Sequence, residues 1–442
     1  MNLNGAKRPY LVLGAGVSGL AAARALQEKG CAYDLLEAAP DAGGLTRSIT
    51  VDAFSFDYTG HLLHLARVPA PSGLPFAGLD DDDWKRVERR AAALVGGRLV
   101  TAPVQYNLSE LPPPLYDAVS ASYDARPAPR DPASASFRDF VIGGFGEELA
   151  EQFLIPQNEK TMATSLDRLS HDAVKRFFPP PDEARVREGM QRTHENPATY
   201  NSQFWYPRHG GIGRLVHGLA RGIAPGRLHC LQEVVRIDLE RRIAYTRGSH
   251  AWPWEDLFTS LPLHALCAMS GDPDLAAWSK QLTHSATVSF NLGLRGPLPA
   301  ALEGLHWVYV PDRAIPFYRV GVYSNITAGL CPPGRASLYV EVGVPGKELE
   351  GLDVHRDIEP RVLQALAGLG WVKPEDIAVK VVHVIRCAYV HHTPARERLL
   401  GDIFEKLRAH GVFPIGRYGT WDYISMEDSI FSGIAAVQGV TG

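Results

Sequence analysis

The stretch that decides the fold is YLVLGAGVSGLAAARALQEKGCAYDLLEA, residues 10–38. Its apolar start predicts a buried strand, the middle predicts a helix that ends at Gly30, and the last seven residues predict a second strand. Gly14, Gly16 and Gly19 form the pattern G-x-G-x-x-G directly after the first strand and at the head of the helix. The stretch therefore predicts a βαβ unit with a glycine turn.

In that context the glycines predict a dinucleotide-binding site. The first permits the tight turn, the second lets pyrophosphate oxygens approach the main chain, and the helix N-terminus supplies free N–H groups. Glu37 ends the second strand, where its carboxylate is placed to accept hydrogen bonds from ribose hydroxyls. An acid at this position disfavours a ribose 2′-phosphate. We expect Ser18 and Ala38, which adjoin these residues, to belong to the same site.

Size and composition bound the class of protein. A chain of 442 residues exceeds what one hydrophobic core usually supports, so two or three interleaved units are expected. A net charge of −4 with 21% charged residues gives no signal for binding nucleic acid. No stretch approaches the roughly 18 apolar residues of a membrane span, and the start MNLNGAKRPYLVLGAG lacks the features of a signal peptide. We expect a cytoplasmic protein; monomer and homo-oligomer both stay open.

Cysteine and histidine spacing predicts neither disulfides nor a metal site. The five cysteines lie far apart and form no C-x-x-C pair, which is typical of buried small hydrophobic residues. His391 and His392 are adjacent on a predicted strand, so their side chains point in opposite directions. We therefore expect no metal.

The remainder of the chain changes pattern several times. The acidic run 80–83 predicts an exposed helix start, and no internal repeat is found. The predicted elements are helices in 136–156 and 167–178, a helix in 210–223, two strands in 228–246, alternating strands in 284–343, a helix at 354–368, a strand at 378–390, and a final strand, loop and helix after 410.

The segment after Glu37 resembles a flavoprotein superfamily. It contains Gly43 and Gly44, then Arg47, then a β-hairpin pattern that runs to Gly60 and His61. This order is similar to that of amine oxidases, protoporphyrinogen oxidases and UDP-galactopyranose mutases, in which a second glycine pair lets the chain pass close to FAD. Nicotinamide dehydrogenases lack that pair.

Four further segments resemble the mutases within that superfamily. They are FLIPQNEKTMA at 153–163, NSQFWYPRHGG at 201–211, WVYVPDRAIPFYRVGVYSN at 307–325 and GRYGTWDY at 416–423. The resemblance implies an α/β fold with a Rossmann-like FAD-binding domain, a helical domain and an antiparallel six-stranded sheet that holds a nucleotide sugar against the flavin. The implied boundaries are 1–75, 210–265 and 405–442 for the discontinuous FAD-binding domain, 76–209 for the mainly helical domain, and 266–404 for the antiparallel-sheet substrate domain.

The resemblance also implies which residues bind the two ligands. His61, Arg319, Tyr389 and Tyr423 would be catalytic. The implied FAD-binding residues are Gly14, Gly16, Ser18, Gly19, Glu37, Ala38, Gly43, Gly44, Leu45, Arg47, Gly60, His61, Val235, Arg417 and Ser429. The implied substrate-binding residues are Gln105, Phe153, Asn158, Met162, Asn201, Trp307, Tyr309, Arg319, Tyr389 and Tyr423.

Arg319 would hold the substrate pyrophosphate, because a guanidinium matches phosphate oxygens with two parallel hydrogen bonds. The chain departs from the mutase pattern at Ala102, Gln157 and Met162, which replace two tyrosines and a tryptophan on the substrate side. A helical-domain arginine of the mutases has no clear match, and Lys175 or Arg176 would be its replacement.

Three functions follow as hypotheses. The first is an enzyme that uses reduced FAD as the nucleophile to interconvert pyranose and furanose forms of a nucleotide sugar, a UDP-hexose above all, with NAD(P)H as external reductant. The second is an FAD-dependent oxidoreductase of the amine oxidase or protoporphyrinogen oxidase type. The third is a protein in which FAD is structural. Phosphate-binding groups in the substrate wall favour the first.

Overall fold

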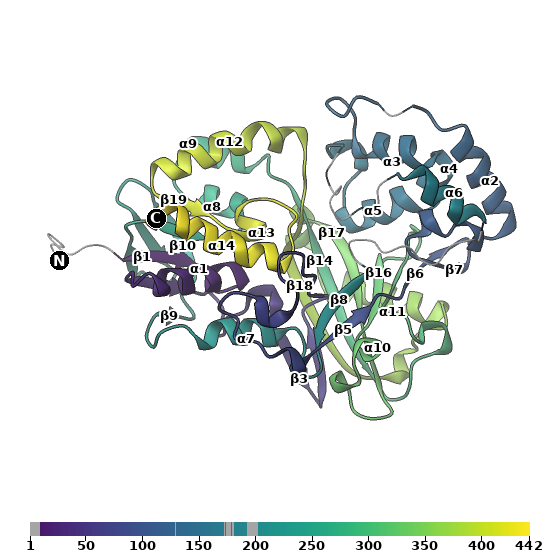
Figure 1. The fold of residues 1–442 in the computed structure, drawn as a ribbon, viewed down its shortest axis with the longest axis horizontal. Coiled ribbons are helices and arrows are strands. Elements are labelled where there is room, and N and C mark those ends of the chain that lie inside the picture. The colour runs from purple at the N-terminus through teal and green to yellow at the C-terminus, as the bar shows by residue number, and fades with distance from the viewer. Residues whose placement is uncertain (1–8, 129, 172, 174–177, 179–180, 192–201) are drawn as a thin grey trace.

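The computed structural model describes residues 9–128, 130–171, 173, 178, 181–191 and 202–442. Figure 1 shows a parallel sheet with its helices on the left, a group of helices at the upper right, and the long strands of a second sheet between them. The mixed α/β architecture expected from the sequence is confirmed. No helix in the described ranges is both long and apolar enough to cross a membrane.

Five strands of the described residues form the first sheet; all are parallel, and β1 lies in the centre. This sheet confirms the predicted βαβ unit, because β1 and β2 pair in parallel and one helix connects them in the chain. Its strands are distant in the chain, and their order is β19 (Val412–Pro414), β13 (Leu257–Thr259), β1 (Tyr10–Leu13), β2 (Tyr33–Leu36) and β9 (Leu228–His229).

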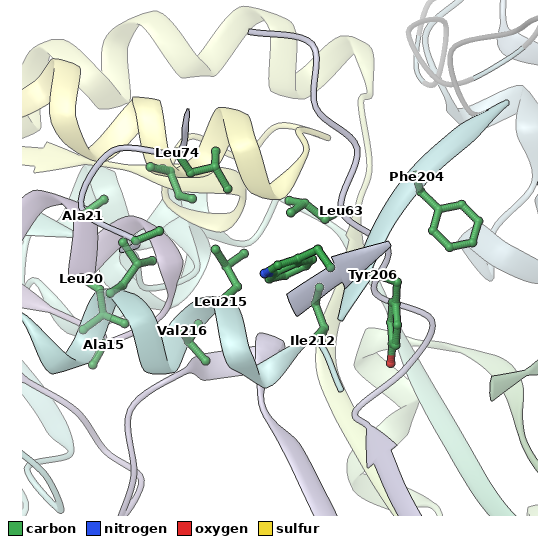
Figure 2. Packing of buried hydrophobic residues seen from close by; sticks show 14 of the residues in the cluster. Ala15, Leu20, Ala21, Leu63, Leu74, Phe204, Tyr206, Ile212, Leu215 and Val216 are labelled. Atoms are coloured by element: carbon green, nitrogen blue, oxygen red, sulfur yellow. The ribbon is translucent and has the colours of Figure 1, made fainter. Parts of the chain in front are cut away.

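Helices cover this sheet through small residues. α1 (Val17–Glu28) packs on α14 (Met426–Thr441), where a Cβ on Gly433 would lie 2.3 Å from the Ser18 carbonyl oxygen. α1 and α7 belong to one buried cluster, and Figure 2 shows Ala15 and Leu20 to one side of Leu215 and Val216. The other helices of this region are α7 (Gly213–Arg221), α8 (Leu263–Met269), α9 (Pro273–Ser279), α12 (Pro394–Ala409) and α13 (Gly416–Gly419).

The second sheet differs from the implied six antiparallel strands. Seven described strands form it, and β15 pairs in parallel with β6 while the other pairs are antiparallel. The hairpin of β6 and β7 lies within the range assigned to the helical domain; it supplies backbone partners to β15, which would otherwise be an open edge. The strand order is β18 (Ile377–Val390), β14 (His284–Leu294), β17 (Ala336–Pro345), β16 (Arg319–Val322), β15 (Trp307–Tyr309), β6 (Ala91–Val95) and β7 (Arg98–Thr101).

The helical group has its own buried core. The prediction for 136–156 is confirmed, with a π-helical turn over Ala150–Leu154 between two α-helical segments. The helix predicted for 167–178 lies partly outside the described residues. The described part of this segment has a 3₁₀ turn at Leu166–Arg168. The α-helices of this group are α2 (Pro113–Asp124), α3 (Phe137–Phe145), α4 (Glu147–Leu149), α5 (Ile155–Met162) and α6 (Glu183–Gln191).

Smaller elements complete the fold. The acidic run forms a single 3₁₀ turn at Asp81–Asp83, which the Asp80 carboxylate caps and which leads into a strand. The prediction of a helix start at this position is therefore wrong. The predicted helix at 354–368 is confirmed as a π-helical turn followed by α11 (Glu359–Gly368). The remaining elements are α10 (Tyr323–Ile326) and the strands β3 (Ser48–Val51), β4 (Phe54–Asp57), β5 (Trp84–Glu88), β8 (Gln203–Pro207), β10 (Val234–Asp238), β11 (Ile243–Thr246) and β12 (Ala251–Pro253).

Candidate functional site

One cavity of about 1010 Å³ extends from the glycine turn after β1 to the face of the seven-stranded sheet. Its lining includes the ends of β1 and β2, the turns around Gly44 and Gly60, strands β15 to β18, helix α5 and the segment 415–429. In open α/β sheets, ligands bind beyond the carboxyl ends of the strands, and β1 and β2 end at this cavity. The cavity is the candidate functional site.

The glycine turn exposes main-chain N–H groups to the cavity. Gly14 has a φ of +89°, which favours glycine, and Gly16 caps α1 without any side-chain hydrogen bond. The second glycine pair comes close to the first, because a Cβ on Gly44 would lie 3.2 Å from the Gly16 Cα. With Ser18, these residues line the cavity and leave the N-terminus of α1 open to an anion.

Gly19 has a packing role instead. It does not line the cavity, and a Cβ there would lie 1.8 Å from the Gly14 carbonyl oxygen. The third glycine of the motif therefore lets α1 sit close to the turn, while the first two shape the surface that a ligand would meet.

Glu37 is fixed by main-chain donors at the end of β2. Its Oε2 accepts a hydrogen bond from the Ala15 N–H at 2.8 Å, and its Oε1 accepts one from Ala39 at 2.9 Å. Glu37 and Ala38 line the cavity. Because each carboxylate oxygen has two lone pairs, the fixed side chain still has acceptor capacity toward the cavity.

Besides Gly19, two predicted cofactor residues lie outside the cavity lining. Val234 and Gln232 line it, whereas Val235 does not and is 41% exposed, because adjacent strand residues point to opposite faces. Arg47 turns back on its own loop: its Nε donates to the Gly44 carbonyl at 3.0 Å, and its guanidinium lies 4.9 Å from the centre of the Tyr58 ring.

The remaining predicted cofactor residues line the cavity. Gly60 is pressed against the sheet, since a Cβ there would lie 2.0 Å from the Tyr339 hydroxyl. His61 follows it with a buried Nδ1 that has no hydrogen-bond partner among the described residues. Burial, reinforced by the positive charge of Arg417, lowers the pKa of His61 to about 4, so its imidazole is neutral at pH 7. The others are Gly43, Leu45, Arg417 and Ser429.

Arg319 lies on the cavity wall but is already paired. β16 and β17 place it directly opposite Glu341, and its guanidinium forms two hydrogen bonds with that carboxylate, one of them Nη2 to Oε1 at 3.0 Å. Glu341 is 1% exposed, and both residues line the cavity. Glu341 was not among the predicted site residues, although a carboxylate between two valines on a buried strand is a visible signal in the sequence.

Arg417 lies among three tyrosine rings. Its guanidinium carbon is 4.1 Å from the ring centre of Tyr423, 5.4 Å from Tyr389 and 5.7 Å from Tyr418. Its Nη2 donates to the Ala388 carbonyl at 3.1 Å, while its buried Nε has no hydrogen-bond partner among the described residues. Burial raises the pKa of Tyr389, so that phenol stays protonated and can donate a hydrogen bond.

The opposite side of the cavity belongs to the helical group. Phe153 lies within the π-helical turn that precedes α5, a feature frequent at functional sites. Gln105 is 2% exposed, and the Asn158 side chain donates to the Leu154 carbonyl at 2.7 Å. The predicted substrate residues that line the cavity are Gln105, Phe153, Asn158, Met162, Trp307, Tyr309, Arg319, Tyr389 and Tyr423. Asn201, Lys175 and Arg176 lie outside the described residues.

The structure adds cavity residues that sequence reasoning did not find. Arg185 on α6 lines the cavity, with its guanidinium over the ring of Tyr106. No sequence signal separates it from Arg187, two residues along the same helix, which pairs with Asp124 away from the cavity. Further lining residues of this kind are Arg89, Tyr318, Tyr418 and Met426.

Comparison with known proteins places this arrangement in a recurring fold. Residues 12–70 match the family model of an NAD(P)-binding Rossmann-like domain. The structure of reduced UDP-galactopyranose mutase superposes with a TM-score of 0.90 at 24% identity, covering 99% of this chain and 94% of that one. A protein from Exiguobacterium sp. assigned as a protoporphyrinogen oxidase gives 0.74 at 17% identity, covering 98% and 99%. Putrescine oxidase bound to putrescine gives 0.65 at 14% identity, covering 99% of each chain. The chain therefore has the fold of UDP-galactopyranose mutase, which the amine oxidases share at lower similarity.

Proposed function

We propose that this protein is an FAD-dependent enzyme that interconverts the pyranose and furanose forms of a nucleotide sugar, with a UDP-hexose as the first candidate substrate. One observation carries the proposal: a single cavity is lined both by two facing glycine turns and by a wall of arginine and tyrosine side chains. The first feature suits the pyrophosphate of a dinucleotide, and the second suits the diphosphate of a sugar nucleotide.

The residues present fit FAD. The open N-terminus of α1 and the fixed Glu37 carboxylate suit its pyrophosphate and ribose. His61 Nδ1 and Arg417 Nε are buried in the cavity wall without hydrogen-bond partners among the described residues, as expected where a ligand supplies them. When bound and reduced, FAD would supply the nucleophile for the anomeric carbon of the sugar.

The chain's own residues would position the substrate and stabilise the departing charge. Arg417 and the phenols of Tyr389 and Tyr423 form a cationic, hydrogen-bonding surface for the diphosphate. Arg185 would add a second cation from α6. Phe153 offers an aromatic face for the base, and Gln105, Asn158, Met162, Trp307 and Tyr309 would complete the substrate-binding surface.

The sugar part of the substrate is set by residues that differ from the mutase pattern. Gln157 donates from its Nε2 to the Tyr318 carbonyl at 3.1 Å, and its Oε1 is buried without a partner among the described residues. Met162 is 5% exposed and contributes apolar volume without a hydrogen-bond donor. We infer a hexose whose hydroxyl pattern suits an amide at residue 157.

A second candidate function is oxidation of an amine by an enzyme of the amine oxidase type. Glu341 favours it, because a carboxylate in the cavity wall would attract a substrate ammonium group. Arg319 works against it, since the guanidinium already neutralises that carboxylate.

Isomer conversion and oxygen uptake distinguish the two functions. The FAD-loaded protein, reduced anaerobically with dithionite or NAD(P)H, is incubated with a panel of UDP-hexopyranoses, and chromatography resolves the furanose products. In air, the oxidised protein is incubated with primary amines in an oxygen electrode. We expect a furanose product that depends on flavin reduction and no amine-dependent oxygen uptake. Oxygen uptake without any isomer formation would refute the mutase proposal.

Arg185→Ala is expected to weaken nucleotide-sugar binding by about 10- to 100-fold, because a hydrogen bond to a charged group contributes about 1.5–3 kcal/mol. Titration of UDP into the reduced protein measures this affinity. FAD content should not change, since Arg185 lies on the helical side of the cavity. Arg187→Ala is the matched control on the same helix and should leave the affinity within twofold. Equal loss in both variants would assign the effect to α6 stability.

A further inference from the structure

Three side chains with metal-binding atoms meet behind the wall of the main cavity. His264 lies on α8, His284 begins β14, and Cys387 is near the end of β18. One ligand atom from each lies within 4.8 Å of the other two. The indole ring of Trp421 contacts both imidazoles edge-on, with its centre 5.1 Å from that of His264 and 6.0 Å from that of His284.

Hydrogen bonding leaves these groups available as ligands. His264 Nδ1 is buried and has no hydrogen-bond partner among the described residues. His284 Nδ1 lies 3.3 Å from the Ser285 carbonyl oxygen, and a proton held there leaves the lone pair on Nε2. Cys387 is a free thiol and 8% exposed. A buried imidazole nitrogen without a partner is the observation that a cation would explain.

Cysteine binds a metal ion as the thiolate, whereas histidine binds it as the neutral imidazole. A cation would therefore have to displace one proton from sulfur, which leaves to solvent as the metal–sulfur bond forms.

We propose that His264, His284 and Cys387 bind one zinc-class divalent cation. Two imidazole nitrogens and one thiolate are borderline to soft ligands, which zinc prefers over oxygen-only sets, and a water would complete the tetrahedron. The ligands come from α8, β14 and β18. The cation would therefore link α8, which follows a strand of the parallel sheet, to the edge of the second sheet formed by β18 and β14.

The proposed metal site adjoins residues that line the main cavity. Pro262 lies two residues before His264, and Ala388 follows Cys387, and both line that cavity. Holding α8 against β18 therefore fixes the backbone that presents Ala388 to Arg417 and Tyr389 to the cavity. This revises the expectation of no metal site, which considered only residues that are near one another in sequence. The inference does not rest on the proposed mutase function.

Cobalt titration tests the site directly. The full chain, loaded with FAD and stripped of metal by a chelator, is titrated with Co²⁺ alone, whose thiolate-bound tetrahedral complexes absorb at longer wavelengths than oxidised flavin. We expect one equivalent bound per chain with such a band, and an affinity that falls as the pH is lowered, because protons compete with the cation for its ligands. Added Zn²⁺ should abolish the band and raise the melting temperature.

Variants assign the signal to these ligands. Cys387→Ala and His264→Gln should each lose the band and the zinc-dependent rise in melting temperature while retaining FAD. Cys267→Ala is the matched control, because Cys267 is a buried thiol on the same helix α8 and lies outside the cluster. Absence of a thiolate band in the wild-type protein, or an unchanged band in Cys387→Ala, would overturn the proposal.

Discussion

Arg319→Ala is expected to lower the free energy of unfolding by about 3–5 kcal/mol, the loss typical when one partner of a buried ion pair is removed. The reason is Glu341, which is 1% exposed and would lose the guanidinium that pairs with it. The rings of Tyr318 and Tyr339 flank the guanidinium, with centres 6.0 Å and 5.8 Å from it, so the variant also loses contacts with two aromatic rings. Urea unfolding followed by circular dichroism measures the change.

A double-variant cycle separates the effect of losing the ion pair on stability from the effect of losing side-chain volume. Glu341→Gln removes one charge, and Arg319→Met with Glu341→Gln removes both while retaining volume. Because burial of two charges is itself unfavourable, the double variant should recover most of the stability lost in Arg319→Ala. If the free energy of unfolding of Arg319→Ala lies within about 1 kcal/mol of the wild-type value, the ion pair is solvated and the explanation from a buried charge is wrong.

The same variants decide what Arg319 does for the substrate. The family resemblance implies a direct contact of Arg319 with the pyrophosphate, yet the guanidinium already forms two hydrogen bonds with Glu341. If the Arg319→Met, Glu341→Gln protein folds and binds UDP as tightly as wild type, then Arg417 and Arg185 carry the diphosphate. A loss of affinity of about 10-fold or more in that stable variant would instead give Arg319 a direct role.

Gly19→Ala is expected to abolish most of the FAD binding and to destabilise the protein by about 3 kcal/mol, the upper end of the range for overpacking. The added Cβ would lie 1.8 Å from the Gly14 carbonyl oxygen and 3.0 Å from its carbon, which are main-chain atoms and cannot rotate away. Helix α1 would have to move off the turn that shapes the proposed pyrophosphate site. Flavin absorbance per purified chain and thermal unfolding report the two effects.

Gly401→Ala is the matched control for a helical glycine. Gly401 lies inside α12, and a Cβ there meets no atom within 4 Å. This change should stabilise the protein by about 0.5–1 kcal/mol, because alanine is the better helix former, and should leave FAD content unchanged. If Gly19→Ala behaved like Gly401→Ala, the close approach of α1 to the turn would not be needed for cofactor binding.

The sequence by itself determined the elements whose signals are local. The run from Tyr10 to Ala38 specified β1, α1 and β2, because strand, glycine turn and helix follow one another without a gap. It also identified the residues that present main-chain N–H groups and the Glu37 carboxylate to the cavity, since their positions are fixed by that short connection. The UDP-galactopyranose mutase fold followed from motifs that were each readable in a few residues.

Only the tertiary structure decided which distant side chains meet. Glu341 pairs with Arg319 because β16 and β17 place them opposite each other. Val234 lines the cavity and Val235 does not, because only one face of β10 points toward it. Arg185 reaches the cavity while Arg187 does not, and His264, His284 and Cys387 converge from three elements. Charge pairing and ligand clusters depend on distances in space, and the packing of the whole chain sets those distances, whereas local periodicity carries no record of them.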